Sequence, residues 1–306
     1  MSREVLRLEN VNKYKGKAHI IKDLSFSVNA GEVFGFLGPN GAGKTSTIRM
    51  IVGLNKVSSG SIYINGHDIK KDFKKVIKEV GAIVENPELY PFLSGYDNLV
   101  HFAKMNDNVS KERIDEVVAL VGLTDAIHMK VRQYSLGMRQ RLGIAVSILH
   151  RPSVLILDEP TNGLDPAGIK EIRHYIRNLA EKEGVAVIVS SHLLGEIEMM
   201  CDRICVIKDG QLVTIQDVND ATSVEQYQFI LKATPLDKAQ QLLIQLDYVE
   251  HTSIVDDALH IKLPEVKVPE MIHALSQAQI AMYAFYREKV NLEARFFEMI
   301  GGDSNA

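Results

Sequence analysis

The segment from Gly38 to Thr45, with the letters GPNGAGKT, constrains the fold of this chain more than any other part of its sequence. It matches the pattern G-x-x-x-x-G-K-[ST], which forms a loop around phosphate groups. An apolar stretch precedes it at 33–37, and a helical pattern follows it at 45–54. A strand, a glycine-rich turn and a helix in this order direct backbone N–H groups at one anion. The sequence therefore predicts a phosphate site in an α/β fold.

The residue types of this loop fit the chemistry of a nucleoside triphosphate. Glycines let the backbone take up left-handed geometry and approach oxygen atoms closely. We expect Lys44 to bridge the β- and γ-phosphates and the Thr45 hydroxyl to bind Mg²⁺. The predicted nucleotide-binding residues of the loop are Gly38, Asn40, Gly41, Gly43, Lys44, Thr45 and Ser46.

The rest of the first two thirds of the chain also indicates an α/β fold. Short apolar runs of the kind found in buried parallel strands occur at 154–157, 185–189 and 204–207. Helical patterns occur between such runs, at 111–121 and 169–182. The N-terminal part alternates instead, which predicts antiparallel strands at 6–10, 24–28 and 61–64.

Two of the predicted strands end in polar residues that suit phosphate chemistry. Asp158 and Glu159 follow the strand at 154–157, and His192 comes shortly after the strand at 185–189. Parallel strands place such residues at one sheet edge, where ligands bind. We expect Asp158 to hold Mg²⁺, Glu159 to orient the attacking water and His192 to contact the γ-phosphate. The alternative for the two acids is a capped turn formed with Pro160.

The length of 306 residues favours one large domain and one smaller domain. The pattern changes near residue 217, which predicts domains at 1–216 and 217–306. In the second domain we expect strands at 227–232, 248–252, 258–263 and 282–287 and helices at 236–246, 269–279 and 292–300. The order βαββαβ, followed by a helix, indicates a small ferredoxin-like α+β unit.

Composition excludes several classes of protein. The net charge of −4 argues against a nucleic-acid partner, because such domains carry basic stripes. The apolar runs are far shorter than the ~20 residues of a membrane span, and no signal peptide is expected. The two cysteines, Cys201 and Cys205, could form a metal or redox pair, but without neighbouring ligands they are expected to be ordinary reduced thiols.

Later motifs make a family resemblance visible. Residues 134–141, YSLGMRQR, resemble the signature of the ABC ATPases, usually LSGGQRQR, and they precede the acidic strand as in that family. Residues 162–165, NGLD, resemble its D-loop, and His192 matches its switch histidine. Tyr14 stands where the family stacks an aromatic ring on adenine, although it could be an ordinary aromatic at a strand end. The resemblance to ABC transporter ATP-binding subunits covers roughly residues 3 to 215.

The resemblance implies a P-loop NTPase fold of the ABC type, with an antiparallel β subdomain, a helical subdomain and the small C-terminal domain. It implies ATP and Mg²⁺ as cofactors and catalytic roles for Glu159 and His192. Two copies would sandwich ATP head to tail, with Asp165 contacting the partner. The signature residues expected to meet the partner's ATP are Ser135, Gly137 and Gln140. The subunit would drive multi-spanning permeases at the cytoplasmic face of the membrane.

The chain departs from the family pattern at three positions. Leu136 and Met138 replace a glycine and a glutamine of the signature, and Glu85 replaces a glutamine expected to contact Mg²⁺ and to face the membrane subunit. Glu85 could also be a surface acid in a loop. The segments ENP at 85–87 and LSG at 93–95, with the tail at 291–297, resemble exporters that protect bacteria from lantibiotics and bacitracin.

We therefore expect an ATPase that powers export of a peptide antibiotic or a similar amphiphile. One alternative is a soluble ABC-type ATPase that acts on the ribosome, and another is a regulator that binds ATP without cleaving it. The C-terminal domain is expected to regulate the motor or to stabilise its dimer.

Overall fold

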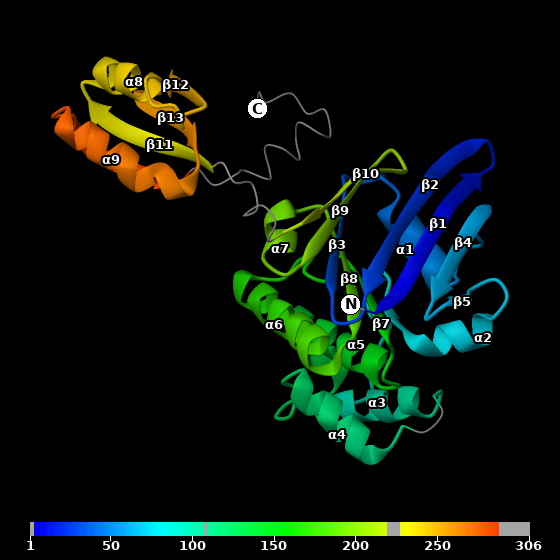
Figure 1. Cartoon of the computed structure of the whole chain (residues 1–306). Coiled ribbons are helices and arrows are strands. Elements are labelled where there is room, and N and C mark those ends of the chain that lie inside the picture. The colour runs from blue at the N-terminus through cyan, green and yellow to red at the C-terminus, as the bar shows by residue number, and fades with distance from the viewer. Residues whose placement is uncertain (1–2, 107–108, 219–226, 288–306) are drawn as a thin grey trace. The chain divides into compact units, whose positions relative to one another are not determined.

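The computed structural model describes residues 3–106, 109–218 and 227–287 (Figure 1). Backbone contacts divide the chain into an N-terminal unit that ends at Val218 and a C-terminal unit that begins at Asn219. This division falls beside the expected domain boundary at residue 216.

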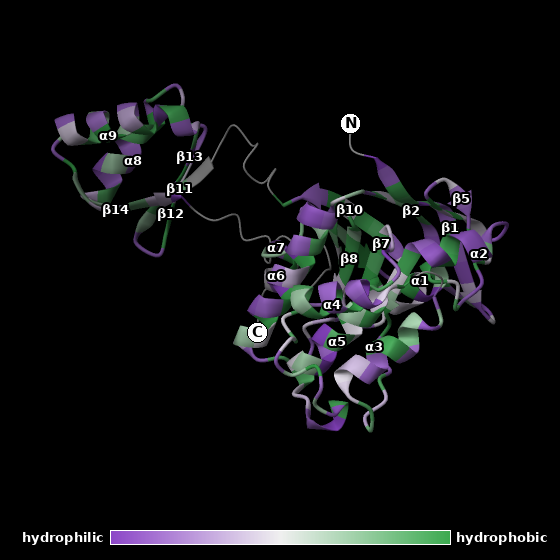
Figure 2. Ribbon diagram, turned by 90° about the horizontal axis from the view of Figure 1, so that it is seen from below, coloured by the Kyte–Doolittle hydropathy of each residue, from purple (hydrophilic) through white to green (hydrophobic). Residues whose placement is uncertain are grey.

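The centre of the N-terminal unit is a six-stranded sheet in the order β10-β9-β3-β8-β7-β6. Its strands are β3 (Val33–Leu37), β6 (Val80–Ile83), β7 (Val154–Asp158), β8 (Ala186–Ser191), β9 (Arg203–Lys208) and β10 (Gln211–Asp217). All pairs are parallel except β9 with β10. Every residue of β3, β7 and β8 is buried, which explains their unbroken apolar runs. Figure 2 shows β7 and β8 in green, the colour of hydrophobic residues.

Helices cover this sheet. They are α1 (Lys44–Ile51), α5 (Leu136–Ile148), α6 (Pro166–Glu183) and α7 (Leu194–Glu198). Helices α6 and α7 contact β3 and β8, whereas α1 contacts β7 and α5 contacts β6. The chain between β6 and α5 forms the helical part of the unit, with α3 (Gly95–Ala103), α4 (Lys111–Leu120) and the 3₁₀ turn Val131–Gln133.

A second, antiparallel sheet has the order β2-β1-β4-β5. Its strands are β1 (Glu4–Lys15), β2 (Ala18–Asn29), β4 (Ser59–Ile64) and β5 (His67–Asp68), followed by α2 (Phe73–Val76) and the 3₁₀ turn Ile77–Glu79. Strands β1 and β2 are longer than expected, because pairing continues beyond register shifts near Asn10, where φ is 45°. Leu6, Leu8 and Phe26 pack with Phe34 and Phe36 of β3 in one core.

The C-terminal unit is a four-stranded antiparallel sheet in the order β12-β13-β11-β14. Its elements are β11 (Tyr227–Thr234), α8 (Leu236–Ile244), β12 (His251–Val255), β13 (Ala258–Leu263), the 3₁₀ turn Glu265–Lys267, α9 (Val268–Gln277) and β14 (Ala281–Arg287). Element order and pairing agree with a ferredoxin-like arrangement. Both helices contribute to one core with β11 and β13, including Leu231, Leu243 and Leu259.

One strand of this unit differs from its expected position, and one expected helix lies outside the described residues. Strand β12 begins at His251 rather than at residue 248, because its pairing with β13 starts at His251 and Lys262. The helix expected at 292–300 falls in the part of the chain that the structure does not describe.

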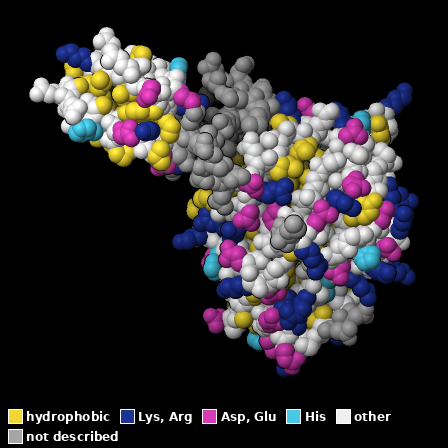
Figure 3. Space-filling view, viewed as in Figure 1, with side chains coloured by type: hydrophobic (Ala, Val, Ile, Leu, Met, Phe, Trp, Pro, Cys, Tyr) yellow, Lys and Arg dark blue, Asp and Glu magenta, His cyan; other side chains and the backbone are white. Residues whose placement is uncertain are grey.

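Two further expectations concern the whole described chain. No helix within residues 3–106, 109–218 and 227–287 is long and apolar enough to cross a membrane. Cys201 and Cys205 are buried free thiols, and burial raises the pKa of both. Basic and acidic side chains are interspersed over the face of the N-terminal unit seen in Figure 3.

Candidate nucleotide site

The loop between β3 and α1 requires glycine at defined positions. Gly41 and Gly43 have φ of 83° and 108°, which L side chains rarely adopt. A Cβ on Gly43 would lie 2.4 Å from Cδ1 of Ile21, and a Cβ on Gly38 would lie 2.4 Å from the carbonyl oxygen of Ile207. The spacing of glycines in the sequence is therefore a consequence of both backbone conformation and close packing.

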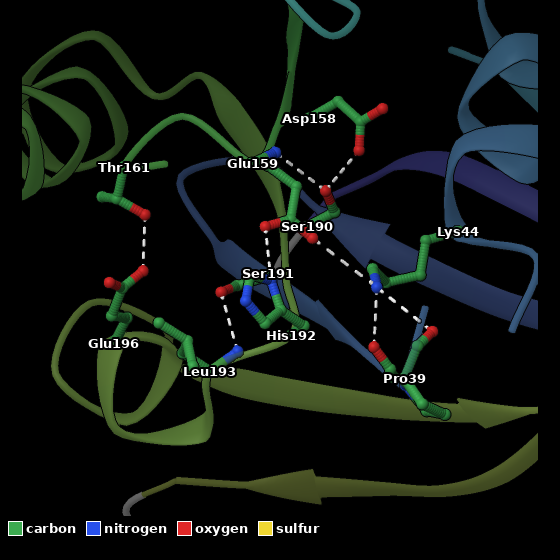
Figure 4. A network of polar contacts seen from close by, with 11 residues as sticks. Pro39, Lys44, Asp158, Glu159, Thr161, Ser190, Ser191, His192, Leu193 and Glu196 are labelled. Carbon is green, nitrogen blue, oxygen red and sulfur yellow. Dashed lines mark hydrogen bonds and ion pairs between the residues drawn. The ribbon is translucent and has the colours of Figure 1, made fainter. Parts of the chain in front are cut away.

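Lys44 begins α1 and is 6% exposed. Its Nζ donates hydrogen bonds to the carbonyl oxygens of Gly38, at 2.6 Å, and Pro39, at 3.4 Å. It also lies 3.6 Å from Oε1 of Glu159, which is 24% exposed (Figure 4). A buried ammonium needs such partners, and the same donors suit the negative charge of a phosphate chain.

Asp158 is the last residue of β7 and is 2% exposed. Its neighbour across the parallel pairing is Ser190 of β8. The Ser190 hydroxyl donates to Asp158 Oδ1 at 2.6 Å and accepts from the Glu159 N–H at 3.0 Å. One serine therefore fixes both acids at the carboxyl edge of the sheet.

Glu159 and His192 meet at this edge, as expected from the ends of β7 and β8. His192 Nδ1 lies 2.7 Å from Glu159 Oε2 (Figure 4). Glu159 has φ of 51°, in the left-handed region that a non-glycine residue rarely occupies. Non-glycine residues in this region cluster at functional sites, where the surrounding structure enforces the conformation.

Lys44, Glu159 and His192 line a cavity of about 430 Å³. Eight of the predicted residues line it: Asn40, Gly41, Gly43, Lys44, Thr45, Ser46, Glu159 and His192. Sequence reasoning missed three others that line it: Ile20, Pro39 and Asn162. Asn162 and Pro39 are members of motifs that were recognised, whereas nothing in the sequence near Ile20 marks it for this site.

The oxygen groups near the cavity suit Mg²⁺. Thr45 lines the cavity, and Asp158 places a buried carboxylate at the same sheet edge. No group of three His, Cys, Asp or Glu side chains that could hold a metal occurs in the described parts of the chain. Mg²⁺ is commonly held by one or two protein oxygens together with substrate phosphates and water, so this donor set fits the ion.

Outside the signature and the D-loop, four predicted residues do not line the cavity, namely Tyr14, Gly38, Glu85 and Asp158. Tyr14 is half exposed, and its ring stacks on His19 with a centroid distance of 4.1 Å. Glu85 follows β6 with φ of 71°, and its carboxylate lies 2.6 Å from a guanidinium nitrogen of Arg49 in the last turn of α1. The structure therefore pairs Glu85 with a cation that sequence reasoning did not identify.

The signature residues lie at the start of α5 and also stand apart from the cavity lining. Ser135 is the N-cap and accepts from the Met138 N–H at 3.2 Å. Gly137 is in the first turn of α5, and a Cβ atom added to it would lie 3.8 Å from Cδ2 of Leu164. Gln140 is buried, and its Oε1 has no hydrogen-bond partner in the described structure.

Asp165 plays the same structural part for α6 as Ser135 does for α5. It is the N-cap, and its Oδ1 accepts from the Gly168 N–H at 2.9 Å. The turn at 162–165 thus connects the cavity residue Asn162 with the start of α6. A cap of this kind satisfies one of the otherwise free backbone N–H groups at the start of α6.

A phosphate loop ahead of α1 that faces acids at the end of a parallel strand is the arrangement shared by P-loop ATPases. Comparison with known proteins narrows this class. A family model described as ABC transporter matches residues 21–162. The chain is 55% identical over 297 residues to an uncharacterized ABC transporter ATP-binding protein, YhcH of Bacillus subtilis (strain 168), covering 97% of this chain and 96% of the relative. The chain therefore belongs to the ATP-binding subunits of ABC transporters, and it is an ATPase.

Other relatives carry more specific names. A bacitracin transport ATP-binding protein of Bacillus licheniformis is 44% identical over 209 residues, 68% of each chain. Its counterpart in Enterococcus faecalis is 33% identical over 298 residues, 97% of each chain. Among solved structures, cbiO1 of Clostridium perfringens, part of the ABC transporter complex cbiONQ, aligns with a TM-score of 0.67 at 25% identity, covering 80% of this chain and 96% of that one. These comparisons confirm the predicted family and fold class.

Proposed function

We propose that this ATPase powers the export of a peptide antibiotic, or a similar amphiphile, through separate membrane subunits. Its similarity to bacitracin transport ATP-binding proteins supports this substrate class. The observation that carries the proposal is the cavity that brings Lys44, Glu159 and His192 together beside the phosphate loop. This geometry serves hydrolysis of a nucleoside triphosphate, which is the energy source that an exporter needs.

A groove in the N-terminal unit offers a docking place for a membrane subunit. It has a volume of about 360 Å³ and lies where the segment after β6 meets α3 and α5. Its apolar lining consists of Val52, Leu54, Ala82, Ile83, Val84, Pro87, Leu89, Phe102 and Val146. Glu88 lines it too, whereas Glu85, next to the lining residue Asn86, already pairs with Arg49. This combination fits a short amphipathic helix with apolar side chains and a basic group.

The chain's own residues suggest how hydrolysis proceeds. Lys44 would exchange its carbonyl partners for phosphate oxygens and stabilise the charge on the γ-phosphate. Glu159 would orient the attacking water, and His192, held by Glu159, would contact the γ-phosphate. Thr45 and Asp158 would hold Mg²⁺, which neutralises phosphate charge when it is bound. Glu85 remains a further predicted contact of this ion.

A second copy of the chain would complete each site. The N-terminus of α5, with Ser135 and Gly137, presents backbone N–H groups to an anion, and the γ-phosphate held by a partner fits this position. Asp165 and Gln140 would stabilise the same interface. One solved relative, 25% identical with a TM-score of 0.62, is a dimeric ATP-binding cassette bound to ADP and Pi. We place the dimer at the cytoplasmic face of the membrane, with the C-terminal unit regulating or stabilising it.

The substitution Glu159→Gln tests this proposal. It keeps the side-chain volume but removes the charge, so ATP binding should persist while phosphate release from the purified subunit falls at least ~100-fold. The variant should also accumulate as a nucleotide-bound dimer, seen by gel filtration with ATP. Glu181→Gln, an exposed acid paired with Arg177 on α6, is the control and should release phosphate normally.

The same pair of variants tests the transport role in cells. A strain that lacks this gene should become sensitive to bacitracin, and the wild type or Glu181→Gln should restore resistance, whereas Glu159→Gln should not. Unchanged phosphate release in Glu159→Gln would refute the role of this acid. Association with ribosomes in place of membranes would refute the exporter and favour the soluble alternative.

A further inference from the structure

Thr161 and Glu196 form a second bridge between the segments that carry Glu159 and His192 (Figure 4). The Thr161 hydroxyl donates a hydrogen bond of 2.5 Å to Glu196 Oε2. Thr161 is 4% exposed and comes shortly after the end of β7. Glu196 lies in the first turn of α7, one helical turn beyond His192. The hydrogen bond therefore joins two segments that are far apart in the sequence.

The two bridges close a ring of contacts at the sheet edge. One is the 2.7 Å contact between His192 and Glu159, and the other is the hydrogen bond between Thr161 and Glu196. On one side the chain between the bridges is only Pro160, whose ring fixes its φ. On the other side it is the short segment 193–195, which starts with a hydrogen bond of 3.0 Å from the Leu193 N–H to Ser191 Oγ. The two contacts and these short segments therefore connect Glu196 with His192.

Thr161 is also the first member of the turn toward Asp165. Its carbonyl oxygen accepts from the Leu164 N–H at 3.1 Å, and the Asn162 N–H donates to the carbonyl oxygen of Glu159 at 3.1 Å. Asn162 lines the cavity, and Asp165 caps α6. The hydrogen bond of Thr161 thus lies between the reacting groups and the turn at 162–165.

We propose that Thr161 and Glu196 are positioning residues for ATP hydrolysis. Their hydrogen bond holds the His192 turn against Glu159 and couples the movement of this turn to residues 162–165. Neither side chain lines the cavity, so both act through other residues. The inference rests on the roles proposed above for Glu159 and His192. It adds that full turnover also requires the hydrogen bond between Thr161 and Glu196.

The substitutions Thr161→Val and Glu196→Ala test this inference, because each removes one partner of the hydrogen bond. Each should lower kcat about tenfold in a phosphate-release assay of the purified subunit, since a small misplacement of reacting groups costs that much or more. KM for ATP should change less than twofold, because the phosphate loop is untouched. The double variant should be no slower than the single ones, since both remove the same bond.

Conservative substitutions separate positioning from a general loss of structure. Thr161→Ser keeps the hydroxyl donor and Glu196→Gln keeps an oxygen acceptor, so both should restore most of kcat. Glu181→Ala, which removes an exposed acid from α6, should behave like the wild type. Binding of fluorescent ADP and a thermal melt establish that every variant used is folded.

Three results would overturn the inference: normal kcat in Thr161→Val, equal losses in Thr161→Ser and Thr161→Val, or losses that multiply in the double variant. Glu159→Gln, measured in parallel, distinguishes this failure from failure of the proposed function. If Glu159→Gln stops turnover while Thr161→Val does not change it, only the positioning inference fails. If Glu159→Gln keeps normal turnover, the proposed catalytic role fails instead.

Discussion

The two units of this chain bury their sheets in different ways. In the N-terminal unit every residue of β3, β7 and β8 is buried, whereas β12 and β14 of the C-terminal unit have no fully buried residue. All polar side chains that are buried in the described residues belong to the N-terminal unit, Lys44 and Asp158 among them. A sheet covered on both faces can keep charged groups away from water at its strand ends. A sheet covered on one face gains stability from apolar packing and offers no comparable edge.

This contrast predicts that substitutions can abolish ATP hydrolysis in the N-terminal unit without changing the stability of the C-terminal unit, and the reverse. The largest effect should follow Lys44→Ala, because the buried ammonium is the principal cation facing the phosphate chain. Phosphate release should fall at least ~100-fold, while a thermal melt should show the C-terminal unit unchanged. Lys70→Ala is the control, since this lysine is exposed and bonded to the Gly60 carbonyl outside the cavity. Normal turnover in Lys44→Ala would refute the claim that ATP hydrolysis depends on the buried charged groups of the N-terminal unit.

A core substitution in the C-terminal unit should have the opposite profile. Leu259 is fully buried in β13, so Leu259→Ala should lower the free energy of unfolding of this unit by about 2–5 kcal/mol. Nucleotide affinity, measured by fluorescent ATP titration, should not change. Ile254→Ala, at a partly exposed position of β12, should cost less than about 1 kcal/mol. A loss of ATP binding in Leu259→Ala would show that the units do not fold independently.

The smallest effect should follow deletion of the chain after residue 217. The deletion leaves all cavity residues in place, so ATP binding should be retained. If the C-terminal unit regulates the motor or stabilises its dimer, hydrolysis or ATP-dependent dimerisation should change by a few fold. Phosphate release and analytical ultracentrifugation measure the two quantities, and an unchanged value of both would exclude this role.

The site was predictable where its signals are local. The phosphate loop is contiguous, and Asp158, Glu159 and His192 follow apolar strands whose carboxyl ends must meet in a parallel sheet. Contacts between segments that are distant in the sequence have no comparable local pattern by which they could be predicted. The ion pair of Arg49 with Glu85, the hydrogen bond of Thr161 with Glu196 and the place of Ile20 depend on how separate elements pack.

Strand boundaries in the fold were also hard to predict from the sequence, because they depend on pairing between strands. We expected a strand at 248–252, but Tyr248 lies ahead of β12, with its ring centroid 5.4 Å from the Lys267 ammonium. The register of β12 is set by its hairpin with β13, in which Val255 faces Ala258 across a turn of two aspartates with positive φ. Only the pairing partner decides where such a strand begins.

The backbone of Glu159 has a consequence for anyone who engineers this protein for heat tolerance. Glu159 and Glu85 both occupy the left-handed region, which costs a non-glycine residue roughly 1–2 kcal/mol. Glycine would relieve this cost at either position. Selection for folding alone would therefore favour replacement of these two acids, one proposed for catalysis and one beside the docking groove. Thermal stability and the rate of ATP hydrolysis therefore make opposite demands on these two backbone positions. A screen for more stable variants must measure ATP turnover as well as the melting temperature.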